Sequence, residues 1–198
     1  MGRIVLAPVS DETVAGGSAP APFDAATFRR TLGRFATGVT LVTAADASGP
    51  LGLIVNAFTS VSLEPPLIAI CPSCHSFTWS RMRRCGRFGV NVLGAEHVKY
   101  VRHSAQAEAD RFTGIDHVLG ESWVPRILSA IDFLDCEPVA EQLAGDQWIV
   151  VARVHDLLAD HGRDALIFIE RKPTPAQRAW TGGRREPCRP EHSTATVV

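Results

Sequence analysis

The sequence of 198 residues has no apolar run approaching the roughly 20 residues that a membrane-spanning helix requires. The short stretch Ile4-Val5-Leu6 after Arg3 is also below the apolar core of a signal peptide. Twenty basic and 21 acidic side chains leave a formal net charge of -1, so no positive field attracts the chain to nucleic acid or to an anionic membrane. These absences predict a cytoplasmic protein without a membrane or nucleic-acid partner, and they favour a small-molecule ligand.

Several sequence motifs are also missing. No Gly-x-Gly-x-x-Gly follows a predicted strand, which removes support for a Rossmann nucleotide site. No Gly-x-Ser-x-Gly is present, and the histidines form no His-x-His or His-Glu-x-x-His pattern, so neither a hydrolase triad nor a common zinc site is indicated. The five cysteines are an odd number in a chain with 45% apolar residues, which argues against a disulfide scaffold.

Cys71-Pro72-Ser73-Cys74-His75 fits the pattern of c-type haem attachment and also contains a redox-like Cys-x-x-Cys. Haem attachment of this type accompanies export, which the N-terminus does not support. A zinc site needs four ligands, and the nearby addition Cys85 has a spacing that matches no common zinc finger. A haem or metal protein therefore ranks far below the other interpretations, and no metal ligand is predicted.

The composition predicts one domain over residues 23–171. The length and apolar content suffice for a single substantial core. Residues 1–22 and 172–198 are rich in small, polar and proline residues without sustained periodicity, so both ends are predicted to be disordered.

Local signals predict mostly strands. Asp24 is a good N-cap for a helix carrying Phe28, Leu32 and Phe35, with Gly38 as its end. The strand 39–43, the turn 46–50 and a strand starting near Gly52 form a hairpin. Over 53–62 the alternation places Leu53, Val55, Ala57 and Val61 on a core face and Asn56, Ser60 and Ser62 on a polar face.

Further strands are predicted at 67–70, 88–93, 131–140, 147–158 and 165–169, and helices at 76–84 and 95–103. Gly145-Asp146 is a hairpin signal between two of the strands. About seven strands that are mostly linked by hairpins, with two or three helices, favour a mainly β, antiparallel barrel over a doubly wound sheet.

A helix that opens at Ser76 presents free backbone N–H groups beside the hydroxyls of Ser76 and Thr78. Arg81, Arg83 and Arg84 follow and could attract a phosphate. Taken alone, however, this segment fits an ordinary capped helix with a solvated basic face better than an anion site.

Four segments of the chain form a set when they are read in order: FRRTLGRFATGVTLVT (28–43), GLIVNAFTSVSLEPP (52–66), CPSCHSFTW (71–79) and RFGVNVL (87–93). Together they resemble the flavin reductase-like family of FMN-binding split barrels. The resemblance continues through Asp110-Arg111-Phe112, FLDCE (133–137) and Gly145-Asp146, and it covers nearly all of residues 24–170. It implies a split barrel, and it reverses the preference for a mere helix cap at Ser76.

The resemblance also implies a flavin site. In the family, the segment matching 56–60 lines the isoalloxazine ring and ribityl chain, and the stretch matching 71–78 holds the phosphate. The strand matching 91–92 contacts the ring edge, and the pair matching 111–112 lies on the phosphate side. The implied cofactor-binding residues are Asn56, Ala57, Phe58, Thr59, Ser60, Cys71, Ser73, Ser76, Thr78, Asn91, Val92, Arg111 and Phe112.

The activity implied is that of an NAD(P)H:flavin oxidoreductase, which reduces free FAD or FMN with NADH or NADPH and supplies reduced flavin to a separate monooxygenase. Family members form homodimers with the flavin near the subunit interface. Because the cofactors carry the chemistry, no catalytic residue is predicted. Ile54 replaces a frequent threonine, and Gln147 replaces a frequent histidine on the nicotinamide side. A flavin carrier or sensor without reductase activity is the alternative.

Overall fold

The computed structural model describes residues 22–104, 111–120, 122–160, 162–170 and 172–175. Strands β2 (Thr40–Asp46) and β3 (Gly49–Val55) form the predicted hairpin, with cross-strand pairs running from Asp46 and Gly49 to Thr40 and Val55. The Ser48 backbone N–H donates to Asp46 Oδ1 at 2.8 Å, and Gly49 has a φ of 115°, which only glycine adopts readily. The strand therefore begins at Gly49, before the predicted Gly52.

The main sheet has seven strands in the order β3-β2-β6-β9-β10-β5-β4, all paired antiparallel. The remaining members are β4 (Phe58–Leu63), β5 (Pro66–Ile70), β6 (Phe88–Val92), β9 (Asp132–Ala144) and β10 (Gln147–Ala159). The hairpin predicted through Gly145-Asp146 joins β9 to β10.

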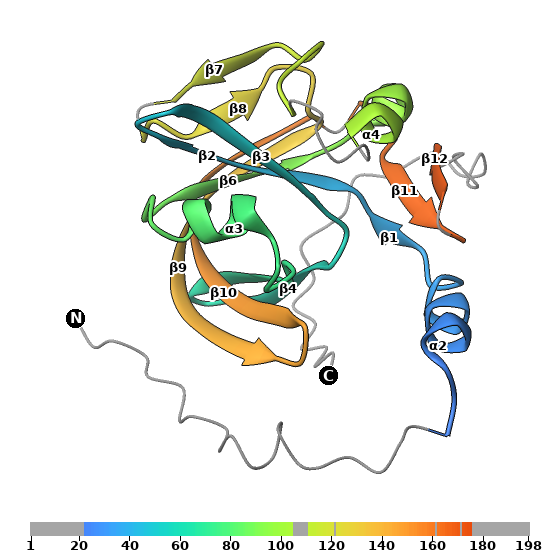
Figure 1. The fold of residues 1–198 in the computed structure, drawn as a ribbon. Coiled ribbons are helices and arrows are strands. Elements are labelled where there is room, and N and C mark those ends of the chain that lie inside the picture. The colour runs from blue at the N-terminus through green and yellow to red at the C-terminus, as the bar shows by residue number, and fades with distance from the viewer. Residues whose placement is uncertain (1–21, 105–110, 121, 161, 171, 176–198) are drawn as a thin grey trace, which may run out of the picture.

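Strands β3 and β4 follow each other in sequence but form the two opposite edges of this sheet. In a flat sheet these edges would be about 29 Å apart at about 4.8 Å per strand. The connection through Asn56 and Ala57 reaches only about 10 Å. The sheet must therefore curl until its edges approach, which produces the predicted antiparallel barrel with an opening at Asn56 and Ala57 (Figure 1).

The prediction of one continuous strand over 53–62 is wrong for the same reason. Its two halves belong to different edges, so the alternation does not continue across the break. Val55 is buried as predicted, whereas Ala57 is exposed and Val61 is 50% exposed.

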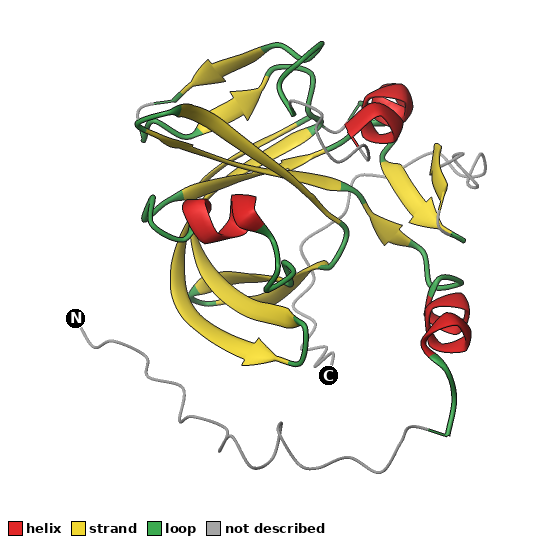
Figure 2. Cartoon of the chain, in the orientation of Figure 1, coloured by secondary structure: helices red, strands yellow, loops and turns green. Residues whose placement is uncertain are grey.

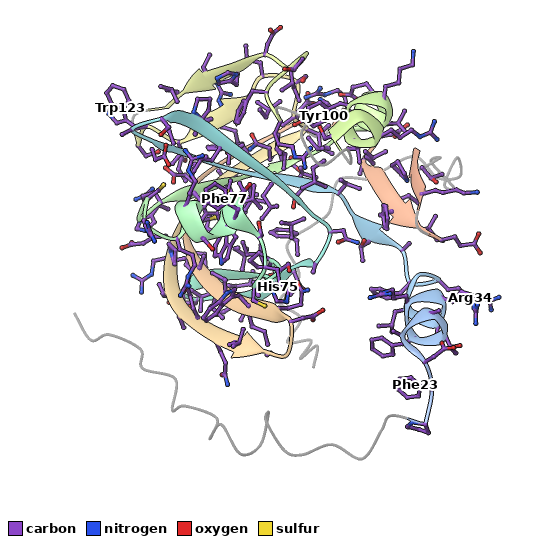
Figure 3. All side chains as sticks on the ribbon, viewed as in Figure 1. Phe23, Arg34, His75, Phe77, Tyr100 and Trp123 are labelled. Atoms are coloured by element: carbon purple, nitrogen blue, oxygen red, sulfur yellow. The ribbon has the colours of Figure 1, made fainter. Side chains whose placement is uncertain are left out.

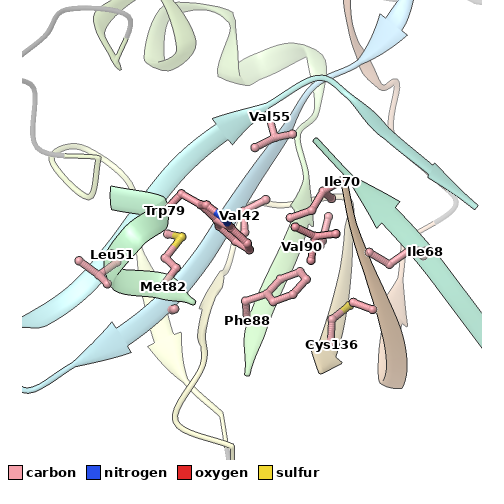
Figure 4. Close-up of a cluster of buried hydrophobic side chains, with 13 residues drawn as sticks. Val42, Leu51, Val55, Ile68, Ile70, Trp79, Met82, Phe88, Val90 and Cys136 are labelled. Atoms are coloured by element: carbon pink, nitrogen blue, oxygen red, sulfur yellow. The ribbon is translucent and has the colours of Figure 1, made fainter. Parts of the chain in front are cut away.

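Helix α3 (Phe77–Met82) covers β2 and β3 and inserts Trp79 and Met82 into the barrel core (Figure 4). The core side chains come from alternate positions of the strands, as expected for a sheet with one buried face. They include Val42, Ile70, Phe88, Val90 and Val150. A second cluster lies beneath the 3₁₀ helix η1 (Ala95–His97) and helix α4 (Val98–Ser104), where it contains Leu41, Leu93 and Val101.

Helix α2 (Ala25–Leu32) stands apart from the barrel (Figures 1 and 3). The Thr27 N–H donates to Asp24 Oδ1 at 2.6 Å, which confirms the predicted cap. The helix ends at Gly33, earlier than the predicted Gly38, because the following residues turn into a short strand. No residue of α2 is buried, and Phe28 and Leu32 are 48% and 55% exposed.

Short peripheral strands complete the fold (Figure 2). They are β1 (Thr37–Gly38), β7 (His117–Leu119), β8 (Pro125–Ile127), β11 (Leu166–Ile169) and β12 (Lys172–Pro175). Strand β12 shows that residues 172–175 of the predicted tail have regular structure, while 1–21 and 176–198 lie outside the described residues. Within the described ranges, no helix has the length and apolar content needed to span a bilayer.

Candidate functional site

The connection between strands β3 and β4, which form the two edges of the sheet, lies at the centre of the candidate site. The Cys71 N–H donates to the carbonyl of Ala57 at 3.0 Å, so the segment after β5 lies directly against the β3–β4 connection. Asn56 is exposed, and its side chain has no hydrogen-bond partner among the described residues. Two segments that the sequence predicted to bind flavin are therefore in contact, with a solvent-exposed amide at their junction.

Phe58, Thr59 and Ser60 lie at the start of β4, opposite Ile70, Ala69 and Ile68 of β5. Because β4 is an edge strand, its backbone groups on the other side have no neighbouring strand within the main sheet. Thr59 and Ser60 are exposed. This edge can therefore offer backbone donors, backbone acceptors and hydroxyls to a ligand.

Ser73 and Gln147 form an isolated antiparallel bridge. The Cys74 N–H donates to the Asp146 carbonyl at 3.0 Å, and the Trp148 N–H donates to the Pro72 carbonyl at 2.8 Å. These two bonds flank Ser73 and Gln147, so this is the pair type in which side chains approach each other most closely. The structure thus places the predicted nicotinamide-side residue beside the predicted phosphate loop.

Ser76 caps α3 as predicted, and its Oγ accepts the Trp79 N–H at 3.1 Å. His75 and Phe77 flank this cap and are both exposed (Figure 3). The predicted cluster of arginines around it is not formed, because those residues lie in the last turn of the helix or beyond it. Arg81 pairs with Asp46 at 2.7 Å and Arg83 with Glu141 at 2.6 Å.

Asn91 is not available to a ligand, because it lies inside the barrel wall with 0% exposure. Its Nδ2 donates to the Leu41 carbonyl and to Thr43 Oγ1, each at 3.0 Å, and its Oδ1 accepts the Ile127 N–H at 2.8 Å. The side chain therefore ties β6 to β2 and β8, and the contact of this strand with the flavin ring stays a prediction. Val92, next to it on β6, is half-buried.

Arg111 and Phe112 pack over Gly52 of β3, where an added Cβ would lie 2.6 Å from the Arg111 Cβ. Phe112 belongs to the cluster beneath α4, whereas Leu51 and Val55 of β3 face the cluster that contains Trp79. Arg111 and Phe112 thus lie on the opposite face of β3 from α3, and the structure does not bring them beside the Ser76 cap.

A cleft of about 490 Å³ lies between α2 and the Asn56-Ala57 connection. Its size is typical of small-molecule sites. Thr37 Oγ1 is buried without a hydrogen-bond partner, and it lies in the lining next to apolar side chains. The full lining is Phe28, Arg29, Leu32, Gly33, Phe35, Thr37, Asn56, Ala57 and Phe168. The sequence did not reveal the contributions of α2 and β11, because apolar helical spacing looks the same for a core helix and for a cleft wall.

The Cys71–His75 segment holds two thiols and an imidazole at the end of β5. Among the described residues, no three His, Cys, Asp or Glu side chains are grouped in a way that could hold a metal ion. Cys71 and Cys74 are free thiols, and burial raises the pKa of Cys71. Cys71 follows β5 and Ser73 forms the bridge to Gln147, and the chain then turns at Cys74 and His75, where the Ser76 N–H donates to the Ser73 carbonyl at 3.1 Å.

An open-edged antiparallel barrel with a ligand-sized cleft at its seam defines the class of the protein. Within that class, the chain belongs to the flavin reductase like domain family, which matches residues 32–177. It is 38% identical over 142 residues to a flavin reductase of Pseudomonas putida, covering 71% of this chain and 84% of the relative. It is 33% identical over 160 residues to the flavin-dependent monooxygenase reductase subunit HsaB of Rhodococcus jostii, covering 81% and 82%.

A solved structure supports the same assignment. The NADH:FAD oxidoreductase SgcE6 of Streptomyces globisporus, in complex with NAD and FAD fragments, superposes with a TM-score of 0.75 at 34% sequence identity. The similarity covers 82% of this chain and 99% of that chain. The family identified from the sequence motifs is confirmed.

Proposed function

We propose that this chain is an NAD(P)H:flavin oxidoreductase that reduces free FAD or FMN and supplies the reduced flavin to a separate monooxygenase. The observation that carries the proposal is the joining of the segments at Ala57–Cys71 and Ser73–Gln147 along one seam of the barrel. The relatives named as flavin reductases and as a monooxygenase reductase subunit support the activity and the type of recipient.

The residues present fit a flavin. The cleft has apolar walls for a ring system, and it has hydrogen-bonding groups that lack partners at Asn56 and Thr37. A buried hydroxyl without a partner costs free energy, which a ligand acceptor or donor recovers. The β4 edge and the Ser73–Ser76 loop continue from the cleft and suit the ribityl chain and the phosphate.

Bound flavin and nicotinamide supply the redox chemistry themselves, with a hydride passing from nicotinamide C4 to flavin N5. The role of the chain is to bind and align them, which lowers the entropic part of the barrier. Asn56–Ser60 hold the flavin at the seam. Gln147, next to Ser73, orients the nicotinamide by hydrogen bonding through its amide, without the charge that a histidine could carry.

Initial rates with the four combinations of NADH or NADPH and FAD or FMN test this proposal. We expect loss of nicotinamide absorbance with at least one combination, and a spectrum of bound flavin after mixing. Absence of turnover with every combination overturns it. Flavin binding without nicotinamide oxidation selects the alternative of a carrier or sensor, and a gain of activity in Gln147→His then assigns the deficit to that residue.

A homodimer belongs to the same proposal. Helix α2 leaves its apolar side chains in solvent, with Phe35 beyond its end 77% exposed, and these residues border the cleft. A second copy that covers this face would bury apolar surface and close the cleft at the same time. The cytoplasmic location expected from the sequence stays a prediction.

A further inference from the structure

We infer that Arg83 is a positioning residue that holds Gln147 opposite Ser73 and so sets the approach of the nicotinamide to the flavin. This inference rests on the proposed function. Arg83 directly follows α3, and its guanidinium lies 4.1 Å from the centre of the Trp148 ring. Trp148 is the next residue after Gln147, so the contact acts on the strand that carries it.

The guanidinium is held from a second side. Arg83 Nε and Nη2 both donate to Glu141 Oε2, at 2.8 and 2.6 Å. Glu141 lies on β9 and Trp148 on β10, close to the end of the hairpin that joins them. Arg83 thus contacts both strands of the hairpin. Its guanidinium donates to Glu141 on β9 and lies over the Trp148 ring on β10. A planar guanidinium presents two N–H donors and a flat face at once, whereas a compact ammonium group can only partly replace these contacts.

Helix α3, which Arg83 directly follows, is held firmly in position. Trp79 and Met82 are buried in the barrel core, so the helix cannot shift without opening the core. The hairpin end is less well anchored, because Leu143 and Ile149 near it are 48% and 42% exposed. Trp148 also packs at the edge of the barrel core that contains Trp79 and Met82. Arg83 adds a side-chain link from the residue after α3 to both strands of the hairpin. Loss of Arg83 therefore loosens the hairpin end and leaves Ser76 in place.

The consequence is selective for one substrate. Contacts of the flavin with Asn56–Ser60 come from β4 and its preceding connection, and the Ser76 cap is held by α3, whose Trp79 and Met82 are buried in the core. Contacts of the nicotinamide through Gln147 depend on the hairpin end. Arg83→Ala should raise the KM for the nicotinamide nucleotide about three- to ten-fold, as expected for loss of a cation–π contact with an ion pair. The KM for flavin should change by less than about two-fold, and Arg83→Lys should recover part of the loss.

A double-mutant cycle with Gln147→Ala provides the test. If Arg83 acts through Gln147, then Arg83→Ala raises the KM for the nucleotide in the wild-type background and leaves it unchanged in the Gln147→Ala background. Arg84→Ala is the matched control, since it removes the same charge from the neighbouring exposed position. Its KM values should equal those of the wild type. Glu141→Gln weakens the contact between Arg83 and β9, and it replaces Arg83→Ala in the test if that variant does not fold.

Three results overturn the inference: an equal rise of the nucleotide KM in both backgrounds, an equal rise of the flavin KM, or the same effect from Arg84→Ala. The wild-type protein is assayed first. Lack of turnover in the wild type contradicts the proposed function, whereas an active wild type with an unaffected Arg83→Ala variant contradicts only the role of Arg83.

Discussion

Asn91 and Asn56 carry the same side chain in opposite surroundings. The Asn91 amide makes three hydrogen bonds inside the barrel wall, while the Asn56 amide is exposed at the seam without a partner among the described residues. Asn91→Ala leaves the Ile127 N–H without its acceptor inside the barrel wall, which should lower the free energy of unfolding by about 1–3 kcal/mol. Asn56→Ala should change it by less than about 0.5 kcal/mol.

Denaturant unfolding and flavin titration of both variants separate the two roles. We expect Asn91→Ala to lose stability and, once folded, to bind flavin as the wild type does. Asn56→Ala should keep its stability and bind flavin more weakly. Weaker flavin binding by a fully stable Asn91→Ala variant would contradict the structural role given to that residue.

The protonation of His97 should make the free energy of unfolding depend on pH. The Nδ1 of His97 accepts the Gly94 N–H at 3.1 Å, so in this tautomer Nε2 donates to Ser129 Oγ at 2.9 Å. Burial lowers the pKa of His97, and the Glu96 carboxylate offsets this only in part. The unfolded chain takes up this proton near pH 6.5. It therefore binds more protons than the folded chain below that pH, and the free energy of unfolding falls as the pH drops from about 6.5.

Urea unfolding between pH 8 and pH 5 measures this dependence. Carboxylates whose pKa is lowered, such as Asp46 beside Arg81, change stability only at about pH 4 and below, which is outside the pH range of this measurement. His97→Gln should flatten the profile between pH 6.5 and pH 5. Equal slopes for the wild type and His97→Gln would refute the assignment.

At the scale of the elements, Gly89 of β6 lies so close to neighbouring side chains that a larger residue does not fit there. An added Cβ would lie 2.6 Å from the Phe133 ring, 2.7 Å from Thr43 Oγ1 and 2.8 Å from Val124. Gly89→Ala should therefore cost about 1–3 kcal/mol of stability through overpacking. Gly38→Ala is the matched control, because nothing lies within 4 Å of its added Cβ. Thermal unfolding compares the two, and a neutral Gly89→Ala would show that β9 can move away from β6.

The elements also show what the sequence could predict. The caps at Asp24 and Ser76 and the hairpins at Asp46–Gly49 and Gly145-Asp146 depend on neighbouring residues, so local chemistry sufficed. The strand break at Asn56 and the pairing of Ser73 with Gln147 depend on how the barrel closes. No local pattern contains that information. The family motifs indicated which segments bind the flavin, and only the folded structure showed which of these segments are in contact.

At the scale of the whole molecule, α2 lacks the support that a short helix needs. Eight residues are too few for stability in water without tertiary packing, and none of those in α2 is buried. The homodimer proposed above would provide this packing through Phe28, Leu32 and Phe35. Leu32→Glu places a charge in that surface. It should shift the protein from dimer to monomer in analytical ultracentrifugation and weaken flavin binding, because Leu32 also lines the cleft.

Leu119→Glu is the matched control for this experiment. Leu119 lies on β7 and is 49% exposed, close to the 55% of Leu32, but it does not line the cleft. The same change of charge and volume there should leave both the dimer and the flavin affinity intact. A monomeric wild-type protein, or a dimer that Leu32→Glu does not weaken, would contradict the role of α2. Since the cleft opens toward this face, the two readouts must change together if a second copy completes the site.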